Sequence, residues 1–188
     1  PAIEHYKTRG IDLAPLLAPP EMADKVSLRC TREGFFEPVS CFDDELIREV
    51  QPALEKRERI QLEKRVRNVD RTVGARLSGA ITRRYGPEGL ARDTIDLTLR
   101  GSAGQSLGAF LARGVTIRLF GDANDYVAKG LCGGRVIIRP PENAQLIPEK
   151  NVIAGNVSLY GATEGELYIN GLAGERFAVR NSGASAVV

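Results

Sequence analysis

Few side chains in this sequence have the chemistry of a catalytic or metal centre. The single histidine, His5, would have to supply any imidazole base or ligand on its own. The cysteines Cys30, Cys41 and Cys132 form no CxxC pair, which argues against an all-protein zinc or iron–sulfur site. Their scatter also argues against a disulfide framework and favours a reducing compartment. Cys132 has no histidine near it in the sequence, so we interpret it as a packed small residue and not as a nucleophile.

Two glycine-rich stretches invite comparison with phosphate-binding loops. The stretch GSAGQSLG at 101–108 and the glycines at 130, 133 and 134 match neither G-x-G-x-x-G nor G-x-x-x-x-G-K-[ST]. Of the 20 glycines, 14 lie in residues 101–188, where the predicted chain corners already require them. We therefore interpret these glycines as structural.

The composition is that of a folded chain without a strongly charged half. Of the 188 residues, 43% are hydrophobic and 27% are charged, which is enough apolar material to bury a core. The formal net charge of +2 divides equally between residues 1–100 and 101–188, so neither half indicates a nucleic-acid or membrane partner. No apolar run reaches the ~18 residues that a membrane-spanning helix needs, and the polar start PAIEHYKTRG is unlike a signal peptide. We expect the sequence to be part of a longer polypeptide.

Basic residues concentrate between 56 and 84 and raise the hypothesis of an RNA-binding module. Acidic residues are interleaved with them, and no aromatic residue lies between 43 and 84. We favour a solvated face on which basic and acidic residues pair with one another. Sequence-independent binding to nucleic acid needs uncompensated cations, and such binding would depend on the salt concentration. The basic residues are Lys56, Arg57, Arg59, Lys64, Arg65, Arg67, Arg71, Arg76, Arg83 and Arg84.

Helix and strand signals follow one another after residue 42. Asp43 or Asp44 is expected to cap a helix, which Pro52 interrupts and which ends near Arg57. Even spacing of Ile60, Leu62 and Val66 predicts a strand, and apolar residues at every fourth position predict a helix from Thr72 to Tyr85.

Short apolar strands that run into glycine recur in the second half. Corners at Gly101 and Gly121 are 20 residues apart, those at Gly155 and Gly171 are 16 apart, and 140–152 is interpreted as an inserted loop. Repeats of this kind predict a solenoid of stacked strands, a β-helix, with apolar side chains inward. The predicted strands centre on 95–99, 115–119, 136–138, 157–159, 167–169 and 177–179.

These patterns divide the chain into three parts. Residues 1–42 are expected to be an extended connector, with Ile11, Leu13, Leu16 and Leu17 pressed on a neighbour. Residues 43–92 are expected to be a helical lead-in packed on the solenoid, and residues 93–188 the glycine-rich β-helix.

Several long stretches together resemble the carboxyl-terminal domain of the large chain of glutamate synthase. They are HYKTRGIDLAPLL (5–17), RNVDRTVGARLSGAI (67–81), GSAGQSLGAFLARGV (101–115), GDANDYVAKGLCGGRVIIRPP (121–141) and IAGNVSLYGATEGELYINGLAGERFAVRNSGASAVV (153–188). The resemblance implies a mainly β fold, a right-handed parallel β-helix with a short helical lead-in at the N-terminal side. In that family the domain is regarded as structural.

The resemblance also implies what the whole protein does. Glutamate synthase is a cytoplasmic enzyme that makes glutamate from glutamine and 2-oxoglutarate, using an amidotransferase domain and a synthase domain with FMN and a 3Fe–4S cluster. Electrons come from NADPH through a small (beta) subunit that carries FAD, or from NADH or ferredoxin. None of the family's functional motifs falls on this sequence. We therefore expect no catalytic, cofactor-binding or metal-binding residue here, and no catalysis by this chain alone.

We expect polar residues at the chain corners to dock the amidotransferase and synthase domains. An equally weighted alternative is that their side chains only bond turn backbone groups. A different hypothesis is a β-helix subunit of another oxidoreductase, similar to that of formylmethanofuran dehydrogenase. The expected docking residues are Asp122, Asn124, Asp125, Arg176, Arg180 and Asn181.

Overall fold

The computed structural model describes residues 10–19, 21, 25, 27, 29, 31, 40–141 and 143–188. The chain divides into two compact units, Pro1–Val39 and Ser40–Val188. In the first unit, the described residues include a short helix, α1 (Ala14–Leu17), in the segment that was predicted to be extended. Leu16 and Leu17 on this helix are 82% and 75% exposed. His5 and Cys30 lie outside the described residues.

Two consecutive helices open the second unit, as the sequence predicted. Helix α2 (Phe42–Glu49) is followed after Val50 by α3 (Gln51–Lys56), which has proline at its start. The N-cap of α2 is Cys41 and not an aspartate, but Asp44 completes the cap by accepting the Cys41 N–H at 2.9 Å. The expected break before Pro52 is thus confirmed.

Helix α4 (Ala75–Tyr85) is held by a carboxylate from α2. Asp43 is buried, and its Oδ1 accepts the Gly74 N–H at 2.8 Å. Its Oδ2 accepts the Arg76 and Leu77 N–H groups at 2.7 and 3.1 Å. Burial raises the pKa of Asp43 above its usual value, although the three N–H groups and the Arg76 charge oppose this. Asp43 therefore caps α4 from a different helix.

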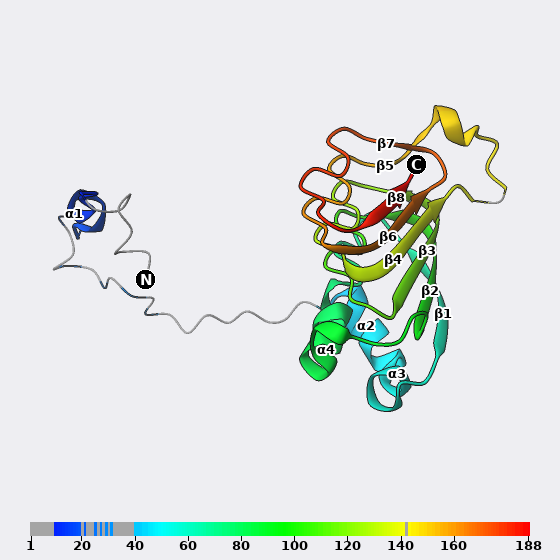
Figure 1. Cartoon of the computed structure of the whole chain (residues 1–188), viewed down its shortest axis with the longest axis horizontal. Helices are drawn as coiled ribbons and strands as arrows, with labels where there is room; N and C mark the ends of the chain where they lie inside the picture. Colours follow the sequence, from blue (N-terminus) through cyan, green and yellow to red (C-terminus); the bar gives the residue numbers. More distant parts are fainter. Residues whose placement is uncertain are drawn as a thin grey trace. The chain divides into compact units, whose positions relative to one another are not determined.

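The second unit is built around a parallel sheet (Figure 1), as the sequence predicted. The strand order is β1-β2-β3-β4-β6-β8, with β5 and β7 paired to each other and β5 also to β3. An inward row of Leu62, Leu97, Ile117, Val136 and Leu167 runs across five strands in register. The strands are β1 (Ile60–Val66), β2 (Ile95–Ala103), β3 (Val115–Ala123), β4 (Cys132–Arg139), β5 (Val152–Ala154), β6 (Glu164–Ile169), β7 (Leu172–Ala173) and β8 (Ser185–Val187), and two short 3-10 helices are η2 (Gly86–Glu88) and η3 (Pro148–Lys150).

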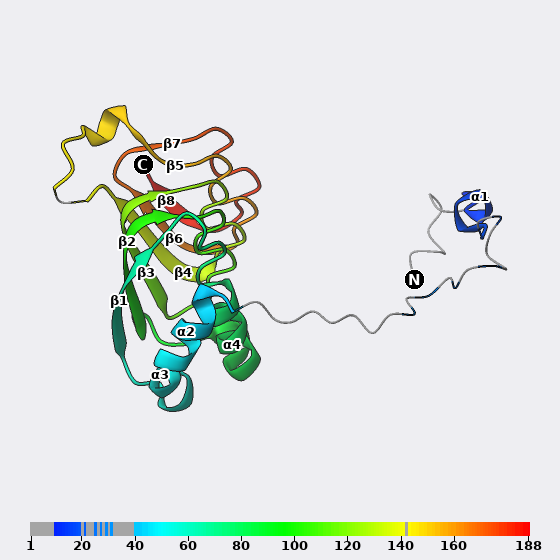
Figure 2. The ribbon, with the colours of Figure 1, turned by 180° about the vertical axis from the view of Figure 1, so that it is seen from behind.

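Narrow loops stack beside the sheet, as Figures 1 and 2 show. We call residues 105–111, 125–131, 156–162 and 175–181 the narrow loops. Every second residue from 106 to 110, 126 to 130, 157 to 161 and 176 to 180 has a positive φ. Each loop bonds the next: the N–H groups of Ser106, Tyr126 and Val157 each donate over 2.8 Å to a carbonyl of the following loop.

Two predicted strands are wrong because they fall in the narrow loops. Val157 and Leu159 have φ of 63° and 59°, and the segment 177–179 has Ala178 at φ 57°. These left-handed values do not occur in a strand. The actual strand nearby, β5, begins at Val152, at the end of the segment predicted as an inserted loop.

Helices α2, α3 and α4 lie at the β1 end of the sheet (Figures 1 and 2). Lys64 of β1 donates to Glu45 at 2.6 Å and to Glu49 at 2.5 Å, both on α2. The Ser78 hydroxyl on α4 accepts the N–H of Ala112 at 3.0 Å, and Ala112 lies in the segment that connects β2 to β3. The helices thereby cover the apolar core where β1 would otherwise leave it open.

Candidate functional site

The best-developed polar site follows from the register of the sheet. Asp96, Thr116, Arg135 and Glu166 are paired across β2, β3, β4 and β6, so their side chains form one row on the outer face. Alternation along each strand turns the neighbouring residues, such as Val136 and Leu167, into the core. The sequence therefore places charged groups from strands far apart along the chain in direct contact.

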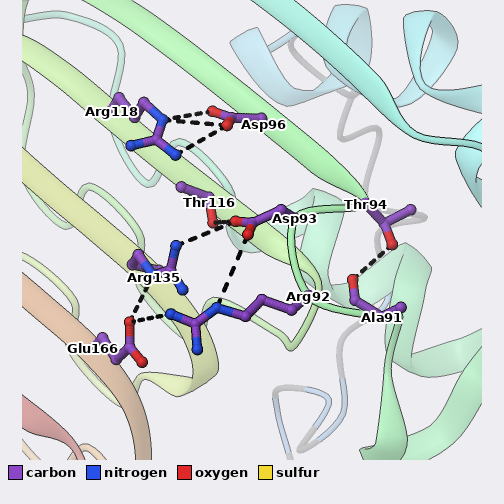
Figure 3. Close-up of polar contacts among 9 residues, drawn as sticks. All are labelled: Ala91, Arg92, Asp93, Thr94, Asp96, Thr116, Arg118, Arg135 and Glu166. Carbon is purple, nitrogen blue, oxygen red and sulfur yellow. Dashed lines mark hydrogen bonds and ion pairs between the residues drawn. The ribbon is translucent and has the colours of Figure 1, made fainter.

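A continuous network of hydrogen bonds and ion pairs joins all of these groups except Asp96 at the beginning of the strands (Figure 3). Asp93, in the turn before β2, accepts the Thr116 hydroxyl at 2.7 Å and an Arg135 N–H at 3.3 Å. Arg135 also donates from Nε to Glu166 at 2.6 Å, and Arg92 reaches the same carboxylate oxygen at 3.1 Å. The Arg135 side chain is only 14% exposed, so water screens these contacts less than ordinary surface pairs.

A second, bidentate pair lies next to this network. Arg118 of β3 donates from Nε to Oδ1 of Asp96 at 3.0 Å and from Nη2 to Oδ2 at 3.1 Å. This geometry is the strongest arrangement for an arginine and a carboxylate. Like the first network, it joins neighbouring strands.

A cleft of about 470 Å³ opens beside the network. Arg113 crosses it, donating to Glu164 at 2.5 Å, and Glu164 raises the pKa of Arg113 further above its usual value. The glycines Gly114, Gly133 and Gly134 also line the cleft. Its lining therefore contains both arginines and carboxylates. Among the described residues, the lining contains no serine, cysteine or histidine.

The network's chemistry is that of a structural clamp. Its arginines and carboxylates are paired with one another, which holds β2, β3, β4 and β6 together. Sequence reasoning missed Arg92, Asp93, Arg113, Arg135 and Glu166. The signal that could have found them is the strand register, which puts an arginine opposite a carboxylate on adjacent strands.

The structure separates the six expected docking residues into two groups. Asp122 accepts the Ser102 hydroxyl at 2.7 Å, Asn124 bonds Asn68, and Asp125 accepts the Asn156 N–H at 2.8 Å. All three partners lie on other turns of the chain, and only Asp125 bonds a backbone group, so these contacts link neighbouring turns.

The second group lies in the last narrow loop. Asn181 accepts the Gly183 and Ala184 N–H groups at 3.3 and 3.0 Å, within its own turn. Arg176 and Arg180 are exposed. Neither has a hydrogen-bond or ion-pair partner within the part of the chain that the structure describes.

Comparison with known proteins assigns the fold to a family. A family model described as "GXGXG motif" matches residues 43–188. The chain belongs to the GXGXG family. The match covers both the helices and the strands of the second unit.

Relatives of this GXGXG chain are glutamate synthases, which confirms the predicted resemblance. "Glutamate synthase [NADH]" of Schizosaccharomyces pombe is 50% identical over 97% of this chain and 9% of its own length. "Glutamate synthase [NADPH] large chain" of Azospirillum brasilense is 46% identical over 98% of this chain and 12% of its own. "Ferredoxin-dependent glutamate synthase, chloroplastic" of spinach is 42% identical over 99% of this chain and 12% of its own. The chain thus spans about a tenth of these relatives.

The described residues of the GXGXG chain do not fit an iron–sulfur cluster. Cys41 precedes α2, whereas Cys132 begins β4, and no three described His, Cys, Asp or Glu side chains are grouped to hold a metal ion. Among the same residues, no helix has the length and apolar character needed to cross a membrane.

Proposed function

We propose that this chain is a structural domain of a glutamate synthase large chain. The observation that carries the proposal is 46% identity to the Azospirillum brasilense large chain over 98% of this chain. The parent would make glutamate from glutamine and 2-oxoglutarate in the cytoplasm. The glutamate synthase relatives favour this function over a subunit like that of formylmethanofuran dehydrogenase.

The finer fold that we propose is a right-handed parallel β-helix, preceded by a connector (1–42) and a helical lead-in (43–92). Parallel strands in register support it, since parallel neighbours require the chain to return to the same edge each time. The hydrogen bonds between successive narrow loops support it as well. Such a stack is stiff, so it sets the distance between whatever docks on it.

We infer that the FMN and the 3Fe–4S cluster belong to the synthase domain of the parent chain. FAD and NADPH would belong to its small (beta) subunit. The chain's own role would be to hold the amidotransferase and synthase domains in place, so that ammonia passes between their sites without loss to water. Nucleic acid and membrane are not expected partners.

Arg176 and Arg180 are the docking residues that the contacts favour, because their charges are not used within the described residues. The test is the double variant Arg176→Ala/Arg180→Ala in the full-length enzyme, with Arg59→Ala as the matched control on another exposed surface. We expect the double variant to hydrolyse more glutamine per glutamate formed, and the control to keep the wild-type ratio. An unchanged ratio in the double variant would refute the docking role.

A further inference from the structure

The outer face of the sheet carries a line of apolar side chains that the ion-pair network does not include. Ile137 of β4, Tyr168 of β6 and Val187 of β8 are paired in register, so their side chains lie side by side on one face. Phe120 of β3 adjoins them, because Phe120 and Ile137 line the same hollow of about 170 Å³. We call Phe120, Ile137, Tyr168 and Val187 the apolar strip, and it crosses four neighbouring strands of the sheet.

The apolar strip is most open where it crosses β6 and β8. Tyr168 and Val187 are 38% and 59% exposed. At the β3 end, the guanidinium carbons of Arg100 and Arg139 lie 4.8 and 4.2 Å from the centroid of the Phe120 ring, so they cover part of it. A parallel sheet is usually covered on both faces, and the chain's own core covers the inner face of this one. Because adjoining exposed apolar side chains mark protein contacts, we expect a contact centred on Tyr168 and Val187.

Two ion pairs border the apolar strip. Arg118, which is paired in register with Ile137, is bidentate to Asp96, and Arg135 donates to Glu166 at 2.6 Å (Figure 3). A polar border of this kind surrounds the apolar centre of many protein interfaces. Since both pairs are internal to the chain, they do not call for charges on the occupant. The strip itself calls for aliphatic or aromatic side chains.

We propose that the apolar strip docks an apolar segment that belongs to another domain of the same longer polypeptide. The inference rests on the proposed function, and it names a surface and the chemistry of its partner. The size of the strip favours a linked occupant, because each partner in a stable complex of separate proteins contributes about 20–30 residues. A domain linked to the chain can use a much smaller contact, since the link raises its effective concentration.

The length of the relatives supports an occupant from the same polypeptide. The chain spans 12% of the Azospirillum brasilense large chain and 9% of the Schizosaccharomyces pombe glutamate synthase. Most of such a protein therefore lies outside the residues described here. Permanent interfaces are also more apolar than transient ones, which favours a fixed neighbour over a separate partner that binds and leaves.

The test places a photo-crosslinking phenylalanine analogue at Tyr168 in the full-length protein and identifies the captured peptide by mass spectrometry. The matched control has the analogue at Tyr126, which is 37% exposed against 38% for Tyr168 but lies on a narrow loop. Mixing isotopically light and heavy protein shows whether the captured peptide comes from the same molecule. We expect position 168 to capture an apolar segment from outside residues 1–188 of the same molecule, and position 126 not to capture it.

The other outcomes of the crosslinking would overturn the proposal. They are capture of a second copy, of another protein, of a charged segment or of residues within 1–188, capture of the same segment from position 126, and no capture at all.

A charge placed in the apolar strip checks the result with Tyr168 unchanged. Val187→Asp should speed hydrogen exchange of the captured segment by about tenfold, because an unpaired carboxylate is costly to bury against apolar side chains, and should leave exchange in β2 unchanged. The matched control is Val152→Asp, which should have no effect on that segment, since Val152 is 61% exposed against 59% for Val187 and lies on β5 outside the strip. Unaltered exchange of the segment in Val187→Asp, or an equal change in Val152→Asp or in β2, would refute the apolar strip as a docking surface. The proposed function would remain intact, since it depends on the glutamine-to-glutamate ratio.

Discussion

Asp43 gives the sharpest test of how the helices are held. Its carboxylate accepts three backbone N–H groups, of Gly74, Arg76 and Leu77, at 2.8, 2.7 and 3.1 Å. The variant Asp43→Ala removes both carboxylate oxygens that accept these three bonds and leaves at least two of the donors, on the buried residues Gly74 and Leu77, without a partner. Each unsatisfied buried donor costs ~1–3 kcal/mol, so the loss should be about 3 kcal/mol.

The assay is hydrogen exchange of the peptide that contains α4 in the full-length protein. A loss of about 3 kcal/mol corresponds to an acceleration of about 100-fold, since 1.4 kcal/mol is a factor of ten. The control is Glu55→Ala, an exposed carboxylate on α3, which should leave the rate unchanged. If Asp43→Ala exchanged as slowly as the control, the carboxylate would not be the cap of α4.

Three further variants test the packing, the acid response and the ion-pair network. A Cβ at Gly121 would overlap the Gly101 carbonyl, whereas Gly161 has nothing within 4 Å, so Gly121→Ala should lower the urea midpoint far more than Gly161→Ala. The Cys41 N–H and a nearby arginine lower the pKa of Asp44 below 3.8, so the stability it confers is present above that pH and is lost as the pH falls. Asp44→Asn should therefore flatten the pH dependence of α2 hydrogen exchange between about pH 5 and pH 2. Arg135→Ala should cost about 2 kcal/mol of unfolding free energy, because two carboxylates lose their central cation.

Each of these three predictions has an outcome that would contradict it. Equal urea midpoints for the two glycine variants would show that β2 and β3 can move apart at Gly121 without a loss of stability. A pH profile of Asp44→Asn that follows wild type would place the acid-sensitive group elsewhere. A loss in Arg135→Ala no greater than that in Arg59→Ala would mean that the network adds nothing to stability.

Strands with inward apolar residues were predictable, because alternation alone decides which face is buried. The alternation pattern gave a wrong prediction at Val157 and Leu159, where every second residue has a left-handed φ. A strand and such a loop share a two-residue period, so periodicity cannot separate them. The short strand β5 was missed for a different reason, since its three residues follow a proline-rich loop and carry almost no alternation.

The ion-pair network could not be predicted from the residues singly. Arg135 and Glu166 are 31 positions apart, and their contact follows only from the pairing of β4 with β6. The loop between these strands includes β5 and a narrow loop, so repeat spacing did not give the register. By contrast, the docking residues were predicted from type alone, and most of them bond their own or neighbouring turns.

The narrow loops imply an order of folding. Nine residues other than glycine have left-handed φ in these loops, at an intrinsic cost on the order of 1 kcal/mol each. Hydrogen bonds to the adjacent loop offset that cost, so a loop without a formed neighbour is disfavoured. We therefore expect the narrow loops to form one after another, beginning on the surface that α2 and α4 provide. These helices precede the loops in the sequence, so on the ribosome the template emerges before the layers it starts.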